Sequence, residues 1–377
     1  MRSAAVIGTG AIGTSVALAL GRHGVAVHLS DVNPTAARTA EAMGAGSLAV
    51  PEGPVDLAVL AVPPARVGTV LARAQRAGLA RAYTDVASVK ARPHDEVARA
   101  GADPARFIGG HPMAGTERSG PLAGRADLFD GRPWVLTPSP ATGQDTLNRA
   151  LELASLCGGT PVVMDATEHD RAVALVSHAP HLVSSLMAAR LADAGESSVR
   201  VAGQGVRDVT RIAGGDPGLW GEILDANAAA VADVLDEFAA DLGRTVSALR
   251  GLAGTDAARR GQAAATLDEV LRHGTLGWAR VARKSGTPLT GLAAVPVLVP
   301  DRPGALARLF TAVGEIGVNI EDVRIEHSMD RPRGLVELLV QQRSASALGR
   351  LLDADGWTVA EDGWTVAEEA APAAGSR

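Results

Sequence analysis

A glycine loop near the start of the chain constrains the fold most strongly. Residues Gly8–Gly13 read G-T-G-A-I-G, and they lie between an apolar run, Ala4–Ile7, and an amphipathic stretch, Thr14–Arg22. In this strand–loop–helix context the first glycine permits a tight turn, Gly10 lets the backbone approach a pyrophosphate, and Gly13 lets the helix pack against the strand. The pyrophosphate meets free N–H groups at the start of the helix. The loop therefore predicts a dinucleotide-binding Rossmann domain.

The strand after the loop's helix ends in an acidic residue, Asp31. In dinucleotide-binding folds a carboxylate about 20 residues beyond the loop accepts a hydrogen bond from the ribose 2′-OH, and it would repel a 2′-phosphate. The sequence therefore predicts NAD rather than NADP as the cofactor. A glycine turn in another kind of α/β protein is the alternative. The predicted cofactor-binding residues are Gly8, Thr9, Gly10, Ala11, Ile12, Gly13 and Asp31.

Strand and helix signals divide the chain into three regions. Over residues 1–166, β-branched runs alternate with Ala-rich helical stretches, which predicts parallel βαβ units and an α/β Rossmann domain. Over 167–286 the strand signals disappear, and long helical patterns predict an all-α domain that ends in the linker-like sequence K-S-G-T-P. The strands expected in the first region are Ala4–Gly8, Ala26–Ser30, Leu57–Val62, Ala82–Val86, Arg106–Gly109, Trp134–Thr137 and Thr160–Val163.

The third region, 294–369, has strand and helix signals in the order βαββαβ, which predicts a small ferredoxin-like α+β domain. The heptapeptide D-G-W-T-V-A-E occurs twice in succession, at Asp355–Glu361 and Asp362–Glu368. Two copies are too few for a solenoid, so we interpret them as a local duplication. The elements expected in this region are Val295–Val299, Ala305–Ile316, Ile320–His327, Leu335–Gln341, Ser344–Leu352 and a last strand near Trp357.

Composition narrows the classes of function. A length of 377 residues favours two or three domains, and a net charge of −6 argues against a broad surface for nucleic acid or anionic membrane. The single Cys157 cannot form an intrachain disulfide, and no Cys/His cluster has zinc spacing, so no metal is expected. No stretch approaches the roughly 20 apolar residues of a membrane span, and the first apolar run is too short for a signal peptide. We therefore expect a cytoplasmic protein without a membrane or nucleic-acid partner.

His111 is the first candidate for catalysis. It follows the strand Arg106–Gly109, and Pro112 stiffens the chain after it, which places it beyond the carboxyl end of a strand, where doubly wound sheets bind ligands. A histidine there accepts a proton from an alcohol near neutral pH. Ser88 lies beyond another strand end, where it is placed to orient the histidine or the alcohol. The alternative is a structural or solvated loop histidine.

A polar stripe is predicted on the helix that begins at Thr167. At about 100° per residue, Asp170, Ser177 and His181 fall within roughly 40° of one another on an otherwise apolar helix, which indicates a buried polar site. Pro180 removes an intrahelical hydrogen bond and is expected to kink the helix. The alternative is a polar edge that faces solvent.

An arginine further along the chain is the candidate for binding a carboxylate. Arg211 is suited to this because a guanidinium binds a carboxylate through two parallel hydrogen bonds. Asp208 lies three residues before Arg211, where it is placed to hold the guanidinium. Arg207 is interpreted as a surface charge.

Three motifs together resemble the prephenate/arogenate dehydrogenase family of tyrosine biosynthesis. They are H-P-M-A-G-T-E-R-S-G at His111–Gly120, S-H-A-P-H at Ser177–His181, and D-V-T-R-I-A-G-G-D-P-G-L-W at Asp208–Trp220. The resemblance covers nearly the whole chain. It implies an NAD-binding Rossmann domain over 1–166, a helical substrate and dimerisation domain over 167–286, and an ACT-like regulatory domain over 294–369. It also implies a homodimer.

The resemblance implies oxidative decarboxylation of prephenate or of arogenate, two substrates that the sequence does not distinguish. It makes His111 the catalytic hydrogen-bond acceptor with Ser88 as its partner. It makes Asp170 and Asp208 supporting residues that lie behind those in contact with the substrate. Trp220 becomes a packing residue of the pocket. The residues that it places around the substrate are Ser177, His181, Arg211, Thr116 and Glu117.

The third domain is similar to ACT domains, which commonly bind amino acids at a helix start and between paired modules. Feedback by tyrosine is therefore a hypothesis, and a dimerising module without a ligand is its alternative. The residues of the expected effector loop are Asp301, Pro303, Gly304, Asn319 and Ile320.

Two other functions compete with this interpretation. A β-hydroxyacid or imine-handling dehydrogenase shares the glycine loop and a helical second domain, but it usually relies on a catalytic lysine there. Here the only lysine of that region is Lys284, in the linker. A non-catalytic NAD-sensing regulator is the second competitor, and the combination of Ser88, His111, His181 and Arg211 argues against it.

Overall fold

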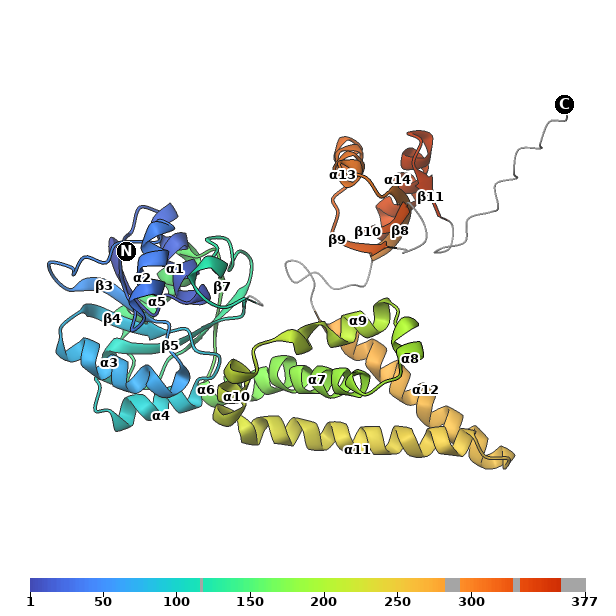
Figure 1. Cartoon of the computed structure of the whole chain (residues 1–377), viewed down its shortest axis with the longest axis horizontal. Helices are drawn as coiled ribbons and strands as arrows, with labels where there is room; N and C mark the ends of the chain where they lie inside the picture. The colour runs from blue at the N-terminus through green and yellow to red at the C-terminus, as the bar shows by residue number, and fades with distance from the viewer. Residues whose placement is uncertain (116–117, 282–291, 328–332, 361–377) are drawn as a thin grey trace. The chain divides into compact units, whose positions relative to one another are not determined.

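The computed structural model describes residues 1–115, 118–281, 292–327 and 333–360 (Figure 1). The chain divides into two compact units, Met1–Leu242 and Gly243–Arg377, and each is described by itself. The boundary between them falls within one helix, α11 (Ala228–Leu252). The division into domains at 166 and 286 stays a prediction.

A seven-stranded sheet forms the centre of the first unit. Its order is β2-β1-β3-β4-β5-β6-β7, and all seven strands expected from the sequence are present. Neighbouring strands are parallel, as expected of βαβ units, except that β6 runs antiparallel to β5. The strands are β1 (Ser3–Ile7), β2 (Ala26–Ser30), β3 (Val55–Leu60), β4 (Ala80–Asp85), β5 (Phe107–Pro112), β6 (Pro133–Thr137) and β7 (Thr160–Val163).

Helices cover both faces of this sheet (Figure 1). Side chains of β1 alternate between two cores, with Val6 in one and Ala5 in the other, as the two-residue period of a strand requires. The first core includes Leu20 of α1 and Leu153 of α5, and the second includes Leu71 of α3. The helices are α1 (Ala11–Arg22), α2 (Pro34–Ala42), α3 (Val67–Arg76), α4 (Ala91–Arg99) and α5 (Gln144–Leu156), with short 3₁₀ turns at Pro64–Arg66, Pro104–Arg106 and Pro121–Ala123.

The helical region begins at α6 (Ala166–Val173). A single turn of π-helix, Ala174–His178, separates α6 from α7 (Ala179–Ala192). Pro180 supplies no amide hydrogen, so the regular ladder of hydrogen bonds cannot continue through it, and the extra residue of the π turn lies just before it. The expected break at Pro180 therefore takes the form of a π turn. The further elements are α8 (Glu196–Arg200), α9 (Gln204–Thr210), a 3₁₀ turn (Arg211–Gly214), α10 (Pro217–Ala226), α11 and α12 (Ala257–Arg280).

The continuous run Ala166–Ala192 is the one helix of the described chain that is long and apolar enough to cross a membrane. It carries His169, Asp170 and His178, which are all buried in the first unit. We therefore interpret this run as part of the folded first unit, where its buried polar side chains contribute to a site.

The C-terminal domain has the ferredoxin-like order that the sequence predicts. Its four strands lie in the order β11-β8-β10-β9, and neighbouring strands are antiparallel. Both helices pack on one face, where Leu309 and Leu348 join the strand residues of the core. The second copy of the heptapeptide lies outside the described residues. The elements are β8 (Leu292–Pro300), α13 (Ala305–Glu315), β9 (Asp322–His327), β10 (Arg333–Gln341), α14 (Gln342–Ala354) and β11 (Thr358–Val359).

Candidate active site

The glycine loop joins β1 to α1 and is packed tightly on one side and open on the other. A Cβ atom at Gly8 would lie 2.1 Å from the carbonyl oxygen of Ala61, and one at Gly13 would lie 1.9 Å from the carbonyl oxygen of Gly8. Gly8 also has a φ of 102°, which L side chains rarely adopt. A Cβ at Gly10, in contrast, would meet no atom within 4 Å. The loop therefore leaves the space over Gly10 for a ligand.

A cavity of about 590 Å³ adjoins this loop, and Gly8 and Asp31 both line it. The Asp31 carboxylate accepts hydrogen bonds from the Thr9 N–H (2.6 Å), the Thr9 hydroxyl (3.0 Å) and the Asn33 N–H (2.7 Å). These bonds fix the carboxylate at the cavity wall beside the glycine loop. Together, the open loop, the helix N-terminus and the placed carboxylate fit a dinucleotide.

A second cavity of about 360 Å³ lies where the Rossmann sheet and the first helices of the helical region meet. His111 reaches it from β5 and Ser88 from the segment after β4, so the ends of two neighbouring strands contribute, as expected. His111 does not lie in a loop, however, because pairing with β6 extends β5 through Pro112. The cavity is lined by Ser88, His111, Met113, Ala114, Gly115, Val176, Ser177, His178, Leu219, Trp220 and Ile223.

A chain of hydrogen bonds runs from His111 away from the cavity. Nδ1 of His111 lies 2.8 Å from Nε2 of His169, and Nδ1 of His169 lies 2.8 Å from Oδ1 of Asp170. His169 and Asp170 are both buried. The sequence analysis identified Asp170 as a support behind the site but missed His169, whose position next to Asp170 was the only signal available.

This chain determines which nitrogen of His111 carries a proton. The Asp170 carboxylate accepts, so Nδ1 of His169 donates to it and Nε2 of His169 carries a lone pair. His111 must then donate from Nδ1 to that lone pair, which leaves the lone pair of His111 on Nε2. His111 is thereby prepared to accept a proton at Nε2.

Lys90 holds both ends of this arrangement together. Its backbone N–H donates to Oδ1 of Asp170 (2.7 Å), and the N–H of Ala91 donates to Oδ2 (2.9 Å). Its buried ammonium pairs with Asp85 and donates to the carbonyl oxygen of Gly110 (2.5 Å), the residue before His111. Burial lowers the pKa of Lys90, and the neighbouring Asp85 opposes that shift. The sequence analysis assigned no role to Lys90.

Burial lowers the pKa of His111 well below its ordinary value of 6.5, and the neighbouring His169, Lys90 and His178 lower it further. His111 is therefore neutral at physiological pH. A neutral imidazole with its free lone pair on Nε2 has the protonation state that a general base needs.

His178 is a second histidine of the cavity, and the sequence analysis did not single it out. The side-chain amide of Asn227 donates to the carbonyl oxygen of Asp170 (2.8 Å) and lies 3.1 Å from Nδ1 of His178. Because that amide nitrogen is a donor, Nδ1 of His178 accepts and its Nε2 carries the hydrogen. Burial lowers the pKa of His178 to about 4, so it is a neutral hydrogen-bond donor.

The three residues of the predicted polar stripe do not converge on one cavity. Ser177 lines it, Asp170 lies behind His169, and His181 stacks on Trp220 with ring centroids 3.5 Å apart. The alternative of a solvent-facing edge is wrong for Asp170 and His181, because both are buried. The π turn between Asp170 and His181 changes the angle per residue on which the predicted stripe depended.

Arg211, the predicted carboxylate clamp, is not among the residues that line the cavity. Arg211 begins a 3₁₀ turn and is exposed, and Asp208 on α9 accepts a hydrogen bond from the amide of Gln204 (2.8 Å). Thr116 and Glu117 lie outside the described residues. Among the residues that the structure does describe, no group of three or more His, Cys, Asp or Glu side chains is placed to hold a metal ion.

The residues of the expected effector loop are divided between the two ends of α13 and do not form one loop. Asp301, Pro303 and Gly304 are exposed in the turn between β8 and α13, and Gly304, with a φ of 83°, caps that helix. Asn319 and Ile320 lie between α13 and β9, where the Asn319 amide donates to Glu321 (2.8 Å).

Acid is expected to destabilise the folded chain between about pH 6.5 and pH 4. His178 has a pKa of about 4 when folded and 6.5 as its ordinary value, so between these limits the unfolded chain binds more protons than the folded one. The free energy of unfolding should therefore fall as the pH falls through this window. Urea unfolding followed at several pH values measures this, and the variant His178→Asn should have a shallower pH dependence. Equal slopes for both proteins would remove His178 as the cause.

In a comparison with known proteins, the chain matches two family models. Residues 16–163 match the nucleotide-binding domain of prephenate dehydrogenase, and residues 165–259 match its dimerization domain. The first match ends at residue 163, the last residue of β7, and the second begins at residue 165, just before α6.

Two curated proteins are similar over most of their length. A probable prephenate dehydrogenase, NovF, from Streptomyces niveus is 44% identical over 92% of this chain and 96% of its own. Prephenate dehydrogenase from Bacillus subtilis is 27% identical over 89% and 91%. Among solved structures, prephenate dehydrogenase from A. aeolicus in complex with hydroxyphenyl propionate and NAD+ is 26% identical, with a TM-score of 0.62 over 73% of this chain and 98% of that one.

Proposed function

The chain belongs to the prephenate dehydrogenase family, and we propose that it oxidises prephenate and releases CO2 to give 4-hydroxyphenylpyruvate. It is an NAD-type oxidoreductase of tyrosine biosynthesis. The observation that carries the proposal is the state of His111. It is a neutral histidine in a cavity at the edge of the nucleotide-binding domain, and its proton acceptor is fixed on Nε2 by two buried residues behind it.

His111 acts on the hydroxyl group of the substrate. NAD, when bound, supplies the acceptor for the hydride that leaves the carbon bearing this hydroxyl. Nε2 of His111 takes the hydroxyl proton, and the C–O bond becomes a carbonyl. The bond from the opposite ring carbon to its carboxylate then breaks, its electron pair enters the ring, and CO2 departs. The ring becomes aromatic, and its carbonyl oxygen takes up a proton to give the phenol.

Asp170 stabilises the positive charge that His111 acquires. The proton that arrives at Nε2 makes His111 an imidazolium, and Nδ1 of that ring donates to His169, which donates to the carboxylate. A buried carboxylate reached through one imidazole lowers the energy of this charge without needing to move. Asp170 therefore positions and stabilises but does not touch the substrate.

The remaining side chains of the site bind and orient the substrate. Ser88, Ser177 and the Nε2–H of His178 line the cavity and offer hydroxyl and ring N–H donors to its oxygen atoms. Arg211 does not line the cavity, and its role as the clamp of one substrate carboxylate is proposed from the family resemblance. Thr116 and Glu117, which lie outside the described residues, are proposed from the family resemblance to bind the substrate as well. Trp220 lines the cavity, and His181 stacks on it.

Formation of NADH from NAD, followed by absorbance, tests the proposed function. Prephenate and arogenate are supplied in parallel to the same preparation, because they differ only in a keto or an amino group of the side chain. A much larger kcat/KM with prephenate is the expected result. A preference for arogenate would reassign the substrate, and binding of NAD without turnover of either compound would instead favour an NAD-sensing regulator.

Asp31→Asn is expected to weaken the discrimination against NADP. The charge on Asp31 repels a 2′-phosphate, whereas an asparagine keeps an acceptor for the Asn33 N–H without that charge. We expect KM for NAD to rise by about tenfold or more, the value of a lost charged hydrogen bond, and kcat/KM with NADP to increase. Asp95→Asn, at an exposed position on α4, is the matched control. An unchanged ratio of kcat/KM for the two cofactors would show that Asp31 does not select NAD.

The match to a dimerization domain supports a homodimer. Large apolar side chains also stay exposed on the helices of the first unit, among them Leu186, Met187, Phe238 and Leu242. The mass of the full chain in solution, measured by light scattering, tests the assembly.

The composition supports action in the cytoplasm, without a nucleic-acid or membrane partner. The C-terminal domain is proposed to bind a small effector such as tyrosine.

A further inference from the structure

The two walls of the catalytic cavity come from different parts of the first unit. Ser88, His111 and residues 113–115 lie on or after strands of the sheet, whereas Ser177, His178 and the other lining side chains belong to the helical region. His111 binds the substrate hydroxyl. The ring carbon opposite that hydroxyl carries both the departing carboxylate and the side chain. The side chain therefore extends toward the wall that the helical region forms.

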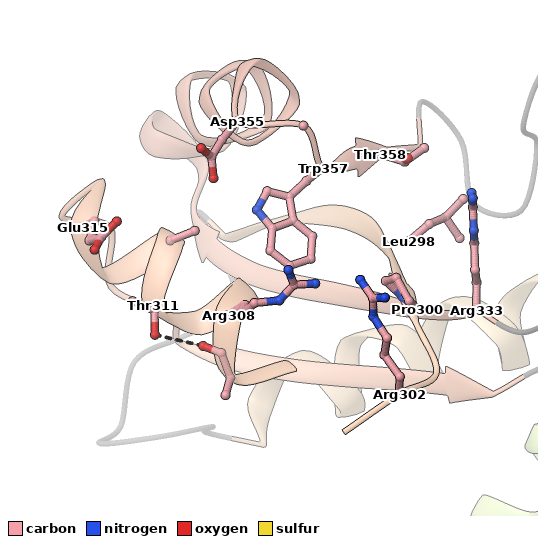
Figure 2. Close-up of a pocket in the computed structure, with 13 residues that line it drawn as sticks. Leu298, Pro300, Arg302, Arg308, Thr311, Glu315, Arg333, Asp355, Trp357 and Thr358 are labelled. Carbon is pink, nitrogen blue, oxygen red and sulfur yellow. Dashed lines mark hydrogen bonds between the residues drawn. The ribbon is translucent and has the colours of Figure 1, made fainter. Parts of the chain in front are cut away.

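Charge does not distinguish a keto side chain from an amino one in the described part of this cavity. None of its described lining residues is Asp, Glu, Lys or Arg. The trough of about 660 Å³ in the C-terminal domain differs in this respect, since three guanidinium groups and two carboxylates line it (Figure 2). In the catalytic cavity the distinction has to come from hydrogen bonds, because a keto oxygen only accepts them and an ammonium group only donates them.

His178 offers this cavity a hydrogen-bond donor that is fixed from behind. The buried Asn227 turns its NH2 group toward it, because the same nitrogen donates to the carbonyl oxygen of Asp170 (2.8 Å), which can only accept. Nδ1 of His178, 3.1 Å from that nitrogen, therefore accepts, and Nε2 carries the hydrogen. Among the described residues Nε2 has no hydrogen-bond partner. Burial lowers the pKa of His178 to about 4, so the ring takes up no second proton near neutral pH.

The other polar side chains on and near this wall do not select between the two groups. The hydroxyls of Ser88 and Ser177 rotate, so they either donate or accept. The indole N–H of Trp220 is a donor too, but it faces Gly215, where an added Cβ would lie 2.6 Å from the indole nitrogen. His178 therefore has the fixed donor that is left for the substrate side chain.

We propose that His178 selects the keto side chain of prephenate against the amino side chain of arogenate, and that Asn227 is the positioning residue that fixes this choice. The Nε2–H of His178 donates to the keto oxygen. An ammonium group in the same place would set one donor against another, and it would lose water without gaining an acceptor. This inference rests on the proposed function, because it assigns a residue to one part of the proposed substrate.

Two variants of equal side-chain length, His178→Gln and His178→Glu, test the proposal. For each protein, kcat/KM with prephenate is divided by kcat/KM with arogenate, so that any loss of folded protein cancels. Glutamine can turn either its oxygen or its NH2 group toward the substrate, so the ratio should fall by about tenfold, the value of one hydrogen bond. Glutamate, ionised at about pH 8, only accepts and pairs with the ammonium group, so the ratio should fall by about 100-fold or more.

Asn227→Ala tests the positioning role. Without the amide the ring of His178 can adopt either tautomer, so the ratio should fall by about tenfold at most. Nitrogen-15 NMR of the histidine rings reads the tautomer directly, and the signal that is missing from His178→Gln identifies His178. We expect its hydrogen on Nε2 in the unaltered chain and a mixture of tautomers in Asn227→Ala. His273→Gln and His273→Glu make the same changes at an exposed position of α12 and should leave the ratio unchanged.

Three results would overturn the proposal. One is an unchanged ratio in His178→Glu, and another is a hydrogen on Nδ1 of His178 in the unaltered chain. The third is an equal loss with both substrates, which would place His178 at a group that they share. A preference of the unaltered chain for arogenate would instead contradict the proposed function, and a lower ratio in His178→Glu would still place His178 at the side chain. If neither compound is oxidised, the proposed function fails, and the ratio of the two Kd values in the same variants tests His178.

Discussion

Replacement of His111 by asparagine is expected to lower kcat with prephenate and NAD by about 10²–10⁴-fold, the usual loss when a general base is removed. Asparagine has no lone pair of comparable basicity at the position of Nε2, so water must accept the hydroxyl proton. The residues that line the cofactor cavity do not include His111, so KM for NAD should change little. Steady-state kinetics with each substrate varied in turn measures both quantities.

The control for this variant is His23→Asn, which makes the same change at an exposed position after α1. It should retain full activity. The pH profile provides a further check, because the pKa of His111 is well below 6.5. The kcat/KM of the unaltered chain should therefore stay level from about pH 8 down to pH 6.5 and fall only in more acidic solution. Unchanged turnover in His111→Asn would remove His111 from the mechanism.

The sequence predicted the strands and the cofactor loop well because their signals are local. Most strands of the sheet are short apolar runs. Close backbone contacts require the glycines at Gly8 and Gly13, and Gly10 leaves space for a ligand, as the strand–loop–helix pattern implies. The direction of β6, in contrast, could not be predicted from local signals. It runs antiparallel to β5 because the chain returns between them without a helical crossover, and no residue pattern within β6 itself records that choice.

The candidate site was only partly predictable because half of it depends on contacts between distant segments. His111 was identified from its place after a strand, whereas its partner His169 is 58 residues away and reaches it only when α6 packs against the sheet at β6. Lys90 lies 80 residues from Asp170 and binds it through a backbone N–H, which any residue type could supply. The π turn could not be seen either, and it changes the angle per residue between Asp170 and His181. In the structure His178, and not His181, lines the cavity.

Asp170→Asn is expected to lower kcat by about 10²–10⁴-fold without changing the cofactor site, as the matching substitution does in serine proteases. An asparagine has one acceptor where the carboxylate has two. If its NH2 group faces His169, that ring must reverse its donor and acceptor, and His111 then carries its hydrogen on Nε2, where the base needs a lone pair. If the NH2 group faces Ala91 instead, a partly buried backbone N–H loses its acceptor, and the charge that stabilises the imidazolium is still missing.

Comparison of single and double variants separates this mechanism from a loss of folding. Asp193→Asn, at the exposed end of α7, is the matched control and should be fully active. His169→Asn breaks the same chain one residue closer to His111, so Asp170→Asn/His169→Asn should be no slower than the slower single variant, because residues that act as a unit are not additive. Thermal unfolding and NAD titration of each variant report the state of the fold. If the two effects on kcat multiply, Asp170 and His169 act independently, and the chain from Asp170 to His111 does not determine the basic nitrogen.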